Sequence, residues 1–331
     1  MKVYILLVPN MFASSALGIM EVLSSADTFW NVVNGASVKP SNSVQLVSRT
    51  REAVACLNGI TLRPDLTFED AGDADIVIIP SLVVGYRGLE NVDAATVDWI
   101  RQIDLKTTRI ASLCSGAFLL AEAGLLNGKS ATTHWALEKA FRNFYPEVHL
   151  EIDKTVVDNG ETLCCGGGMA WQNLILHILH QKGADHALQV ARTFLMQTHE
   201  FGQRPYAGLV AAFHTDGIIS KVQDWMKANF ADLNAVNTGI AMSGLPPRTF
   251  HRRFKSATGM TPTQYVQQLR IEESKLYLTE TKIPVDEIGF KVGYEEPSFF
   301  RRLFKRSTGV SPRQFRQHFS INTTAMADSV S

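Results

Sequence analysis

Short apolar runs alternate with helical patterns through the first half of the chain. The strand-like runs are Val3–Val8, Val44–Val47, Ile76–Ile79 and Ile110–Leu113. The first and third are continuously apolar, which is typical of strands buried on both faces of a mostly parallel sheet. Apolar residues recur at helical spacing between the runs, near Leu17–Asn31, Ala94–Ile103 and Gly116–Ala123. This order predicts a doubly wound α/β domain.

A hairpin and two helices follow in the same region. Val156 and Val157 precede the pair Asn159-Gly160, which favours a tight turn between antiparallel strands. Helical patterns then cover Gly168–Gln181 and Ala184–Leu195. We expect these elements to complete a first domain at residues 1–198.

Beyond that domain the pattern is interrupted and then becomes entirely helical. Glycine and proline break the periodicity over residues 199–216, which we interpret as a linker. The next segment, Ile218–Phe230, is amphipathic and opens a helical domain at residues 217–320. Small polar residues fill 321–331, which predicts a disordered tail.

The helical domain contains a repeated segment. Pro247–Tyr265 and Pro297–Phe315 align without gaps and share 9 of 19 residues. Each copy predicts a helix that begins at its proline, where no amide hydrogen bond is lost. Each helix is followed by a glycine, Gly259 or Gly309, at a position where φ is often positive. The repeat therefore predicts two structurally equivalent units.

Each unit has the order helix, turn, helix. The supporting helices are predicted at Leu233–Met242 and Val285–Val292, and the second helices at Pro247–Ala257 and Pro297–Ser307. A connecting helix at Thr261–Thr279 would be about 28 Å long at 1.5 Å per residue. That length would place the two second helices near one DNA turn apart, about 34 Å, so that one chain reads two successive grooves.

A helix-turn-helix places its second helix in the major groove, with its N-terminal residues at the base edges. Two phenylalanines four residues apart in each second helix should form the core, which leaves Arg252, Arg253, Arg301 and Arg302 free to meet phosphates or bases. The predicted DNA-binding residues are Arg248, Thr249, His251 and Arg252 in the first copy and Ser298, Phe299, Arg301 and Arg302 in the second. We interpret the first copy as the sequence reader and the second largely as a backbone anchor. A helical bundle with merely solvated arginines is the alternative, and two copies in register count against it.

Charge is divided along the chain although the net charge is zero. Residues 215–331 carry 16 lysine and arginine against 11 acidic residues, whereas residues 1–214 carry 16 against 21. Hydrophobic residues make up 45% of the 331, enough for full-sized cores in about two domains. An acidic body with a basic C-terminal module fits a regulator that contacts DNA at one end.

The helical domain resembles the AraC/XylS family of transcription regulators. The resemblance is carried by FHRRFKSATGMTP and by EIGFKVGYEEPSFFRRLFKRSTGVSP, whereas the first supporting helix, AVNTGIAMSG, departs from the family's alanine-rich pattern. It implies double-stranded promoter DNA as a partner, with RNA polymerase as a further one. It does not indicate whether transcription is activated or repressed.

A cysteine with a distinctive context lies in the first domain. Arg109–Phe118 reads RIASLCSGAF, an apolar strand followed by Cys-Ser-Gly and a helical run. A nucleophile on a sharp strand-to-helix turn is exposed, and nearby helix N-terminal amides lower a thiol's pKa. His134, in the sequence ATTHW, could approach the thiol. We expect a ligand pocket that contains Cys114, Ser115, His134 and Trp135.

This region resembles the DJ-1/PfpI family through CSGAFLLAEAGLLNGKSATTHW, and the resemblance spans most of residues 1–195. Enzymes of that family place a glutamate from the segment after the first strand beside the thiol. The corresponding stretch here, Ala13–Leu17, has no carboxylate, and Glu21 lies further along. We therefore expect a vestigial elbow kept for ligand binding rather than catalysis. A thiol-dependent enzyme, a cysteine redox sensor and an elbow that serves only packing or dimerisation are the alternatives.

An AraC-type module joined to a DJ-1/PfpI-like domain resembles the regulators sometimes called GlxA-like. The resemblance implies a small-molecule effector of the amino-acid or amine type and a homodimer formed through the N-terminal domain. Trp135 and Trp171 could offer aromatic faces to a cationic ligand, and ordinary core packing is the alternative.

No metal or other cofactor is expected. The four cysteines and nine histidines show no metal-ligand spacing, and reduced thiols suit a cytoplasmic protein. The apolar run at the N-terminus stops at Pro9, too short for a signal peptide. No run approaches the roughly 20 apolar residues of a membrane span, so no membrane partner is expected.

Overall fold

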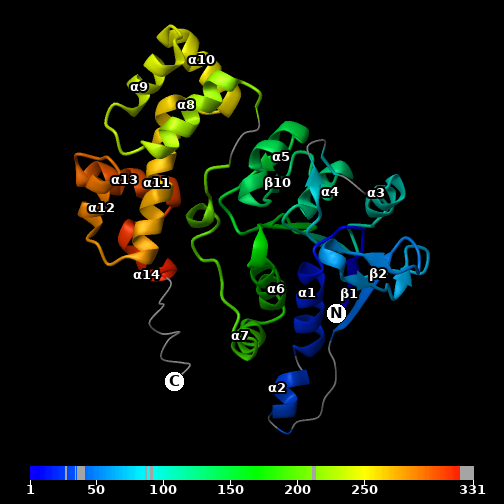
Figure 1. Ribbon diagram of the computed structural model, residues 1–331. Coiled ribbons are helices and arrows are strands. Elements are labelled where there is room, and N and C mark those ends of the chain that lie inside the picture. Colours follow the sequence, from blue (N-terminus) through cyan, green and yellow to red (C-terminus); the bar gives the residue numbers. More distant parts are fainter. Residues whose placement is uncertain are drawn as a thin grey trace. The chain divides into compact units, whose positions relative to one another are not determined.

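The computed structural model describes residues 1–26, 28–33, 35, 42–85, 88–89, 92–210 and 214–320. The chain divides into two compact units, Met1–Gln203 and Arg204–Ser331 (Figure 1). The division falls inside the predicted linker, of which residues 211–213 lie outside the described residues. The predicted tail at 321–331 also lies outside them.

The first unit is built on a seven-stranded sheet with the order β12-β13-β9-β6-β1-β2-β5. Neighbouring strands are parallel except for β12 and β13, which form the predicted antiparallel hairpin. The strands are β1 Lys2–Leu6, β2 Ser43–Ser48, β5 Leu66–Thr67, β6 Ile76–Ile79, β9 Arg109–Leu113, β12 Val156–Asp158 and β13 Thr162–Cys165. Three short pairs lie outside this sheet: β3 Val54–Ala55 with β4 Thr61–Leu62, β7 Val84–Gly85 with β8 Gly88–Leu89, and β10 Ser130–Ala131 with β11 His149–Leu150.

Helices connect the strands of this unit. They are α1 Ser14–Ser25, α2 Thr28–Val33, α3 Ala94–Arg101, α4 Gly116–Glu122, α5 Glu138–Phe144, α6 Trp171–His180 and α7 Ala184–Thr193. Single 3₁₀ turns are η1 Leu57–Gly59, η2 Trp135–Leu137 and η3 Gly168–Ala170. The helical pattern near Leu17–Asn31 is divided between α1, which ends at Ser25, and α2, which begins at Thr28.

The central strands are buried on both faces. All four residues of β6 and of β13 are buried, as are the last four of β1 and of β9. Helix α1 packs against β2 and α6, while α4 packs against β6, β9 and α3. Figure 1 shows these two groups on opposite sides of the sheet. The doubly wound α/β architecture is therefore confirmed.

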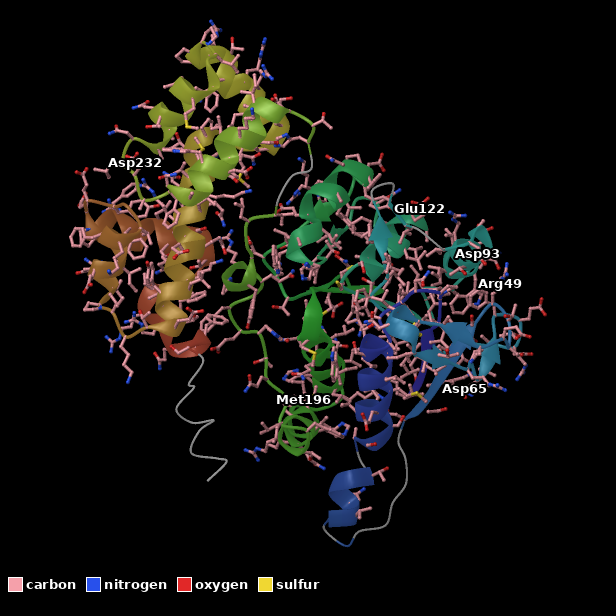
Figure 2. All side chains as sticks on the ribbon, viewed as in Figure 1. Arg49, Asp65, Asp93, Glu122, Met196 and Asp232 are labelled. Carbon is pink, nitrogen blue, oxygen red and sulfur yellow. The ribbon has the colours of Figure 1, made fainter. Side chains whose placement is uncertain are left out.

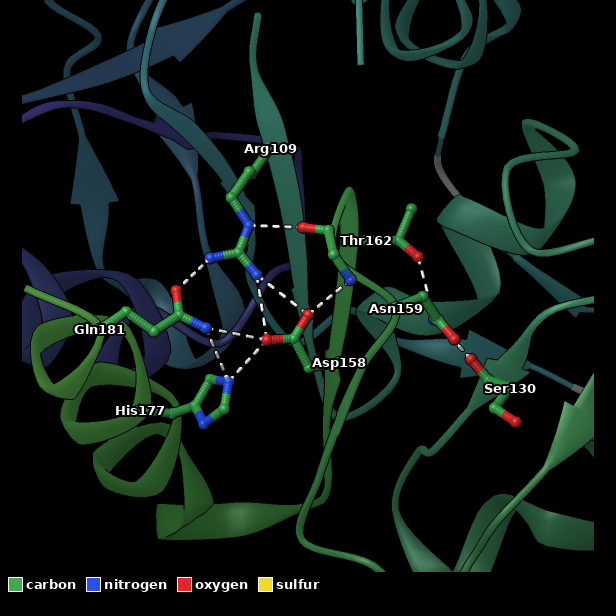
Figure 3. A network of polar contacts seen from close by, with 8 residues as sticks. Arg109, Ser130, Asp158, Asn159, Thr162, His177 and Gln181 are labelled. Atoms are coloured by element: carbon green, nitrogen blue, oxygen red, sulfur yellow. Dashed lines mark hydrogen bonds and ion pairs between the residues drawn. The ribbon is translucent and has the colours of Figure 1, made fainter. Parts of the chain in front are cut away.

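A polar network joins β9 to the hairpin and to α6 (Figure 3). The Arg109 guanidinium contacts Asp158 at 3.0 Å and also donates to the carbonyl of Gly160 and to Gln181. His177 Nε2 lies 2.7 Å from the same Asp158 carboxylate. Burial opposes ionisation of Asp158, but hydrogen bonds from His177 and Gly160 and the charge of Arg109 hold its pKa below the usual range. The network fixes this edge of the sheet.

A capping interaction defines the start of α3. The Asp93 carboxylate accepts a hydrogen bond of 2.8 Å from the Thr96 amide, which satisfies one of the unpaired N–H groups at the helix N-terminus. Arg49 reaches the same carboxylate at 3.0 Å (Figure 2). The Asp93 carboxylate thus joins the start of α3 to Arg49, the residue that follows β2.

The second unit is helical, as predicted. Its helices are α8 Gly217–Ala228, α9 Ala235–Ser243, α10 Pro247–Thr258, α11 Pro262–Glu280, α12 Val285–Lys291, α13 Pro297–Thr308 and α14 Pro312–Phe319, with a 3₁₀ turn, η4, at Arg204–Tyr206. The two units of the repeat are α9–α10 and α12–α13, joined by α11. None of the described helices is long and apolar enough to cross a membrane.

The repeat is structural as well as sequential. Phe250 and Phe254 of α10 are fully buried, and so are Phe300 and Phe304 of α13. Both helices end at a glycine with φ of 80°, the geometry predicted for Gly259 and Gly309. The helices that follow, α11 and α14, begin with the same capping box, Thr261 with Gln264 and Ser311 with Gln314. Equivalent residues thus form equivalent elements.

Candidate functional sites

Helix α10 presents one polar face away from its aromatic core. Arg248, His251 and Arg252 are exposed, and Thr249 is half-buried. Phe250 and Phe254 occupy the opposite face and are buried. This arrangement places the predicted first reading set on an accessible surface at the start of the helix.

Helix α13 presents the corresponding face with a different chemistry. Phe299, Arg301 and Arg302 are exposed, and Ser298 is half-buried. The Ser298 hydroxyl donates to the Glu296 carboxylate. Arg301 forms an ion pair of 2.6 Å with Asp286 of α12, so its guanidinium is already held by the supporting helix. The second set is therefore accessible but partly engaged within its own unit.

The expectation that Arg253 remains free was wrong. Its guanidinium binds both carboxylate oxygens of Asp216, with Nε–Oδ2 at 3.0 Å and Nη2–Oδ1 at 2.9 Å. Asp216 also caps α8, because its carboxylate accepts from the amides of Ile218 and Ile219. An aspartate directly before an apolar helical pattern is the signature that could have indicated this cap.

Two exposed lysines, Lys255 and Lys305, extend the polar faces of α10 and α13 and were not among the predicted DNA-binding residues. Arg248, Arg252 and Lys255 are exposed at intervals of four and three residues, which places them on one side of α10. Ser298, Arg302 and Lys305 hold the equivalent positions in α13. The identity of Lys255 and Lys305 in the aligned repeat was the signal that could have found them. We name these two surfaces the α10 face and the α13 face.

In the first unit, Cys114 lies at a sharp turn between β9 and α4. Its φ is 53°, in the left-handed region that few non-glycine residues adopt. The Cys114 amide donates to the carbonyls of Cys165 at 2.9 Å and Gly166 at 3.2 Å. The Thr133 hydroxyl donates to the Cys114 carbonyl at 2.7 Å. The elbow is thus held from two sides by neighbouring segments.

The Cys114 thiol differs from the other three in its exposure. Cys114 is partly exposed, whereas Cys56, Cys164 and Cys165 are buried. Burial raises the pKa of the Cys164 thiol to about 11, and it also raises the pKa of Cys56 and of Cys165. Because thiolates are the reactive form, the three buried thiols are poor nucleophiles.

Serine hydroxyls bind the loop that follows β6. Ser115 donates to the Leu82 carbonyl at 2.6 Å and accepts from the Leu82 amide at 2.8 Å. Ser15, near the start of α1, accepts from the Ser81 amide at 3.1 Å. A ligand contact through Ser115 stays a prediction, and its hydroxyl is already engaged by Leu82.

His134 lies next to the elbow because Thr133 is bonded to Cys114. Its Nδ1 accepts from the Ala136 amide at 3.1 Å, so the neutral ring carries its proton on Nε2. Burial lowers the pKa of His134. The ring covers Gly167 closely, since a Cβ there would lie 1.7 Å from His134 Cδ2. The half-buried Trp135 ring is centred 5.1 Å from the imidazole.

Trp171 packs in the hydrophobic core, which was the alternative to a ligand contact for this residue. It is 9% exposed, and its ring lies where a Cβ on Gly18 of α1 would be only 2.9 Å away. Of the two tryptophans, Trp135 remains the candidate for ligand contact. No group of histidine, cysteine and acidic side chains able to hold a metal ion occurs among the described residues.

Comparison with known proteins assigns each of the two units to a family model. Residues 1–181 match the DJ-1/PfpI family. The chain belongs to the DJ-1/PfpI family. Residues 241–318 match a helix-turn-helix domain, so a DJ-1/PfpI unit is joined here to a helix-turn-helix unit. Both predicted resemblances are confirmed.

Curated relatives match this chain over different lengths. The HTH-type transcriptional regulator CdhR of Pseudomonas aeruginosa is 26% identical over 250 residues, covering 74% of this chain and 73% of CdhR. The HTH-type transcriptional regulator GlxA of Rhizobium meliloti is 26% identical over 204 residues, covering 60% of this chain but only 62% of GlxA. The isonitrile hydratase of Pseudomonas putida is 34% identical over 133 residues, 39% of this chain and 54% of that enzyme.

A solved structure supports the fold of the first unit. The crystal structure of a putative transcriptional regulator protein from Vibrio parahaemolyticus matches with a TM-score of 0.51 and 23% identity. It covers 59% of this chain and 99% of that one.

Proposed function

We propose that this protein is a sequence-specific DNA-binding transcription regulator whose DJ-1/PfpI unit senses a small metabolite. The observation that carries the proposal is the repetition of the α10 face by the α13 face, with cations at two matching positions, Arg252 with Arg302 and Lys255 with Lys305. The names of the relatives CdhR and GlxA as HTH-type transcriptional regulators support it.

The two faces differ in a way that suggests a division of labour. Helix α10 offers Arg248, Thr249 and His251 near its start, groups able to hydrogen-bond to base edges. Helix α13 begins instead with Ser298 and Phe299, and its Arg301 is paired with Asp286. The first helix therefore reads sequence while Arg302 and Lys305 of the second bind the phosphate backbone, which fixes the register.

Selection of bound duplexes from a random pool tests this proposal. The full chain should enrich a site with one strongly defined half and one weakly defined half. Arg252→Ala should relax one position of the strong half. Enrichment of no sequence at all, at low and at physiological salt, would remove the support for a sequence-specific regulator.

The effector site is proposed beside the elbow. We propose Cys114, His134 and Trp135 as its ligand contacts, and the Trp135 ring, centred 5.1 Å from His134, would offer a face to an amine or amino-acid cation. Assembly through the first unit would give a homodimer, and RNA polymerase is a further partner once DNA is bound. A thermal-shift screen of the full chain against amino acids and amines should find a stabilising ligand, and Trp135→Ala should abolish that shift. A complete panel without any shift would contradict the metabolite-sensing role.

A thiol-dependent enzyme is the second candidate, and the φ of 53° at Cys114 favours it. The isonitrile hydratase relative adds support. Against it, Ala13–Leu17 offers no carboxylate, and the Ser15 hydroxyl there is engaged by Ser81. Turnover of any substrate that disappears in Cys114→Ala would favour this candidate. Reversible oxidation of Cys114 that changes DNA affinity would instead favour a redox sensor.

A further inference from the structure

The last residue of the first unit, Gln203, is buried in a cradle of backbone groups. Gln203 as a whole is only 6% exposed. The amide nitrogen Nε2 lies 2.8 Å from the Thr133 carbonyl and 2.9 Å from the Ile152 carbonyl. Thr132 Oγ1 and the Lys154 carbonyl are also within reach, at 3.1 and 3.2 Å. A glutamine from the connection thus penetrates the α/β unit.

The opposite end of the same carboxamide is also bound. Its oxygen Oε1 accepts from the amides of Gly167 at 3.2 Å and Trp135 at 3.3 Å. Two N–H protons therefore face oxygen acceptors, and two lone pairs face N–H donors, which matches a primary carboxamide. A carboxylate could not donate to the Thr133 and Ile152 carbonyls, and its charge would be buried against them.

The backbone before Gln203 is shaped to deliver it. The Gln203 amide donates to the Asp153 carbonyl at 2.9 Å. Gly202 adopts a φ of 67°, and a Cβ there would lie 2.1 Å from that same carbonyl oxygen. Only glycine allows the chain to approach Asp153 this closely.

The cradle shares its walls with the proposed effector site. Gly167 binds the Gln203 oxygen, and the His134 ring covers that glycine. Trp135, the other donor to Oε1, is a proposed ligand contact. The carbonyl of Gly166, the residue before Gly167, accepts from the Cys114 amide at 3.2 Å. A ligand that displaces the His134 ring against Gly167, or shifts the backbone at Trp135, would therefore act on two of the groups that hold Gln203.

The residues after Gln203 are held by the second unit. The Lys275 ammonium donates to the Ala207 carbonyl. Tyr206 packs edge-to-face on Phe319, with ring centroids 5.1 Å apart. Only two residues separate Gln203 from Tyr206, so the cradle holds the chain immediately before the second unit begins.

We propose that Gln203 is a ligand supplied by the chain itself to a carboxamide-binding site, and that occupation of the Cys114–His134 site releases it. Release frees the connection between the two units and so changes how the DNA-binding unit is presented. This inference rests on the proposed effector site, and it names how that site is linked to DNA binding. A ligand alters the output because it binds the released state better than the anchored state.

Hydrogen–deuterium exchange of the full chain tests the anchor, read at peptides covering residues 199–206. Gln203→Glu and Gln203→Met should raise exchange there by about tenfold or more, because the cradle's hydrogen bonds are lost. Gln197→Glu is the matched control, since Gln197 is exposed and lies on the same segment. Amides of β9 and β13 should keep their protection from exchange in all variants. If the carboxylate introduced by Gln203→Glu unfolds the first unit, the exchange of Gln203→Met still tests the anchor.

Iodoacetamide tests the coupling without knowledge of the effector. Its reaction with the partly exposed Cys114 displaces iodide and leaves a carboxamidomethyl group on the sulfur. The alkylated chain should exchange at residues 199–206 as the Gln203 variants do, and Cys114→Ala treated in the same way should not change.

The outcomes separate this inference from the proposed function. Unchanged exchange in both Gln203 variants would overturn the anchor, and release by the variants without release by alkylation would overturn the coupling. These readings require neither DNA nor effector. A failure to select any DNA sequence would therefore count against the proposed function and not against the anchor.

Discussion

Arg253 of α10 and Asp216 at the start of α8 form a bidentate ion pair, with N–O distances of 2.9 and 3.0 Å. Burial opposes ionisation of Asp216, but bonds from the Ile219 amide and from Arg253 hold its pKa below the usual range. The neighbouring Arg252 is exposed on the α10 face. Two adjacent arginines thus differ: Arg253 is engaged within the unit, whereas Arg252 is exposed, and we propose that it contacts DNA.

Substitution of these two arginines should separate stability from DNA affinity. Arg253→Ala should lower the free energy of unfolding by about 1 kcal/mol, because a half-exposed bidentate ion pair is lost. Arg252→Ala should leave unfolding by urea unchanged and weaken binding to the preferred duplex by about 1–3 kcal/mol. Equal effects of the two variants on unfolding would contradict the assignment.

Lys305→Ala should act on all DNA sequences alike. Its position on the α13 face suits a phosphate contact, which contributes to affinity without reading bases. We expect weaker binding to preferred and to random duplexes by the same factor, and a slope of log affinity against log salt that is smaller by about 1. Fluorescence anisotropy over a salt series measures both. A loss confined to the preferred duplex would instead make Lys305 a base contact.

Stability should fall on mild acidification. Burial lowers the pKa of His134 and of His199 from the ordinary value of 6.5. As the pH falls, the unfolded chain therefore takes up protons first, so stability is complete above pH 6.5 and is lost as the pH drops below it toward the folded-state values. Urea unfolding at pH 7.5 and 5.5 should show this loss. His134→Asn should reduce it, whereas His149→Asn, at an exposed position, should not.

Much of the fold follows from local patterns, whereas parts of the sites do not. The strand β6 has the bounds Ile76–Ile79 that its apolar run predicts. A strand that is buried on both faces is apolar at every position, so it can be recognised from the sequence alone. The repeat also predicted the equivalent helices α10 and α13. The pairing of Arg253 with Asp216 joins residues 37 apart, and neither spacing nor periodicity indicates it. It depends on how α10 docks against α8.

The Gln203 cradle was hidden for a similar reason. Its walls come from Thr132–Trp135, Ile152–Lys154 and Gly167, segments that meet only when β10, the hairpin and the end of β13 are assembled. In sequence, Gln203 is one polar residue in a stretch whose glycines and proline predict a linker. Backbone carbonyls and amides provide nearly all of its contacts. Because every residue carries such groups, no residue type in the sequence marks the cradle.

Labelling of the folded protein with iodoacetamide should modify Cys114 first. It is the partly exposed thiol, and burial holds the other three in the unreactive protonated form. Peptide mass spectrometry after short reaction times should find most of the label on the Cys114 peptide. Comparable early labelling of Cys164 or Cys165 would show that the sheet opens more readily than its buried strands indicate.

The central claim is that one chain places α10 and α13 in two successive major grooves. Hydroxyl-radical footprinting of the chain on its selected duplex tests this most directly. We predict two protected patches on one face of the DNA, centred about one helical turn, roughly 10 base pairs, apart. Arg302→Ala should weaken one patch and Arg252→Ala the other. A single patch, or two patches that respond equally to both variants, would contradict the claim.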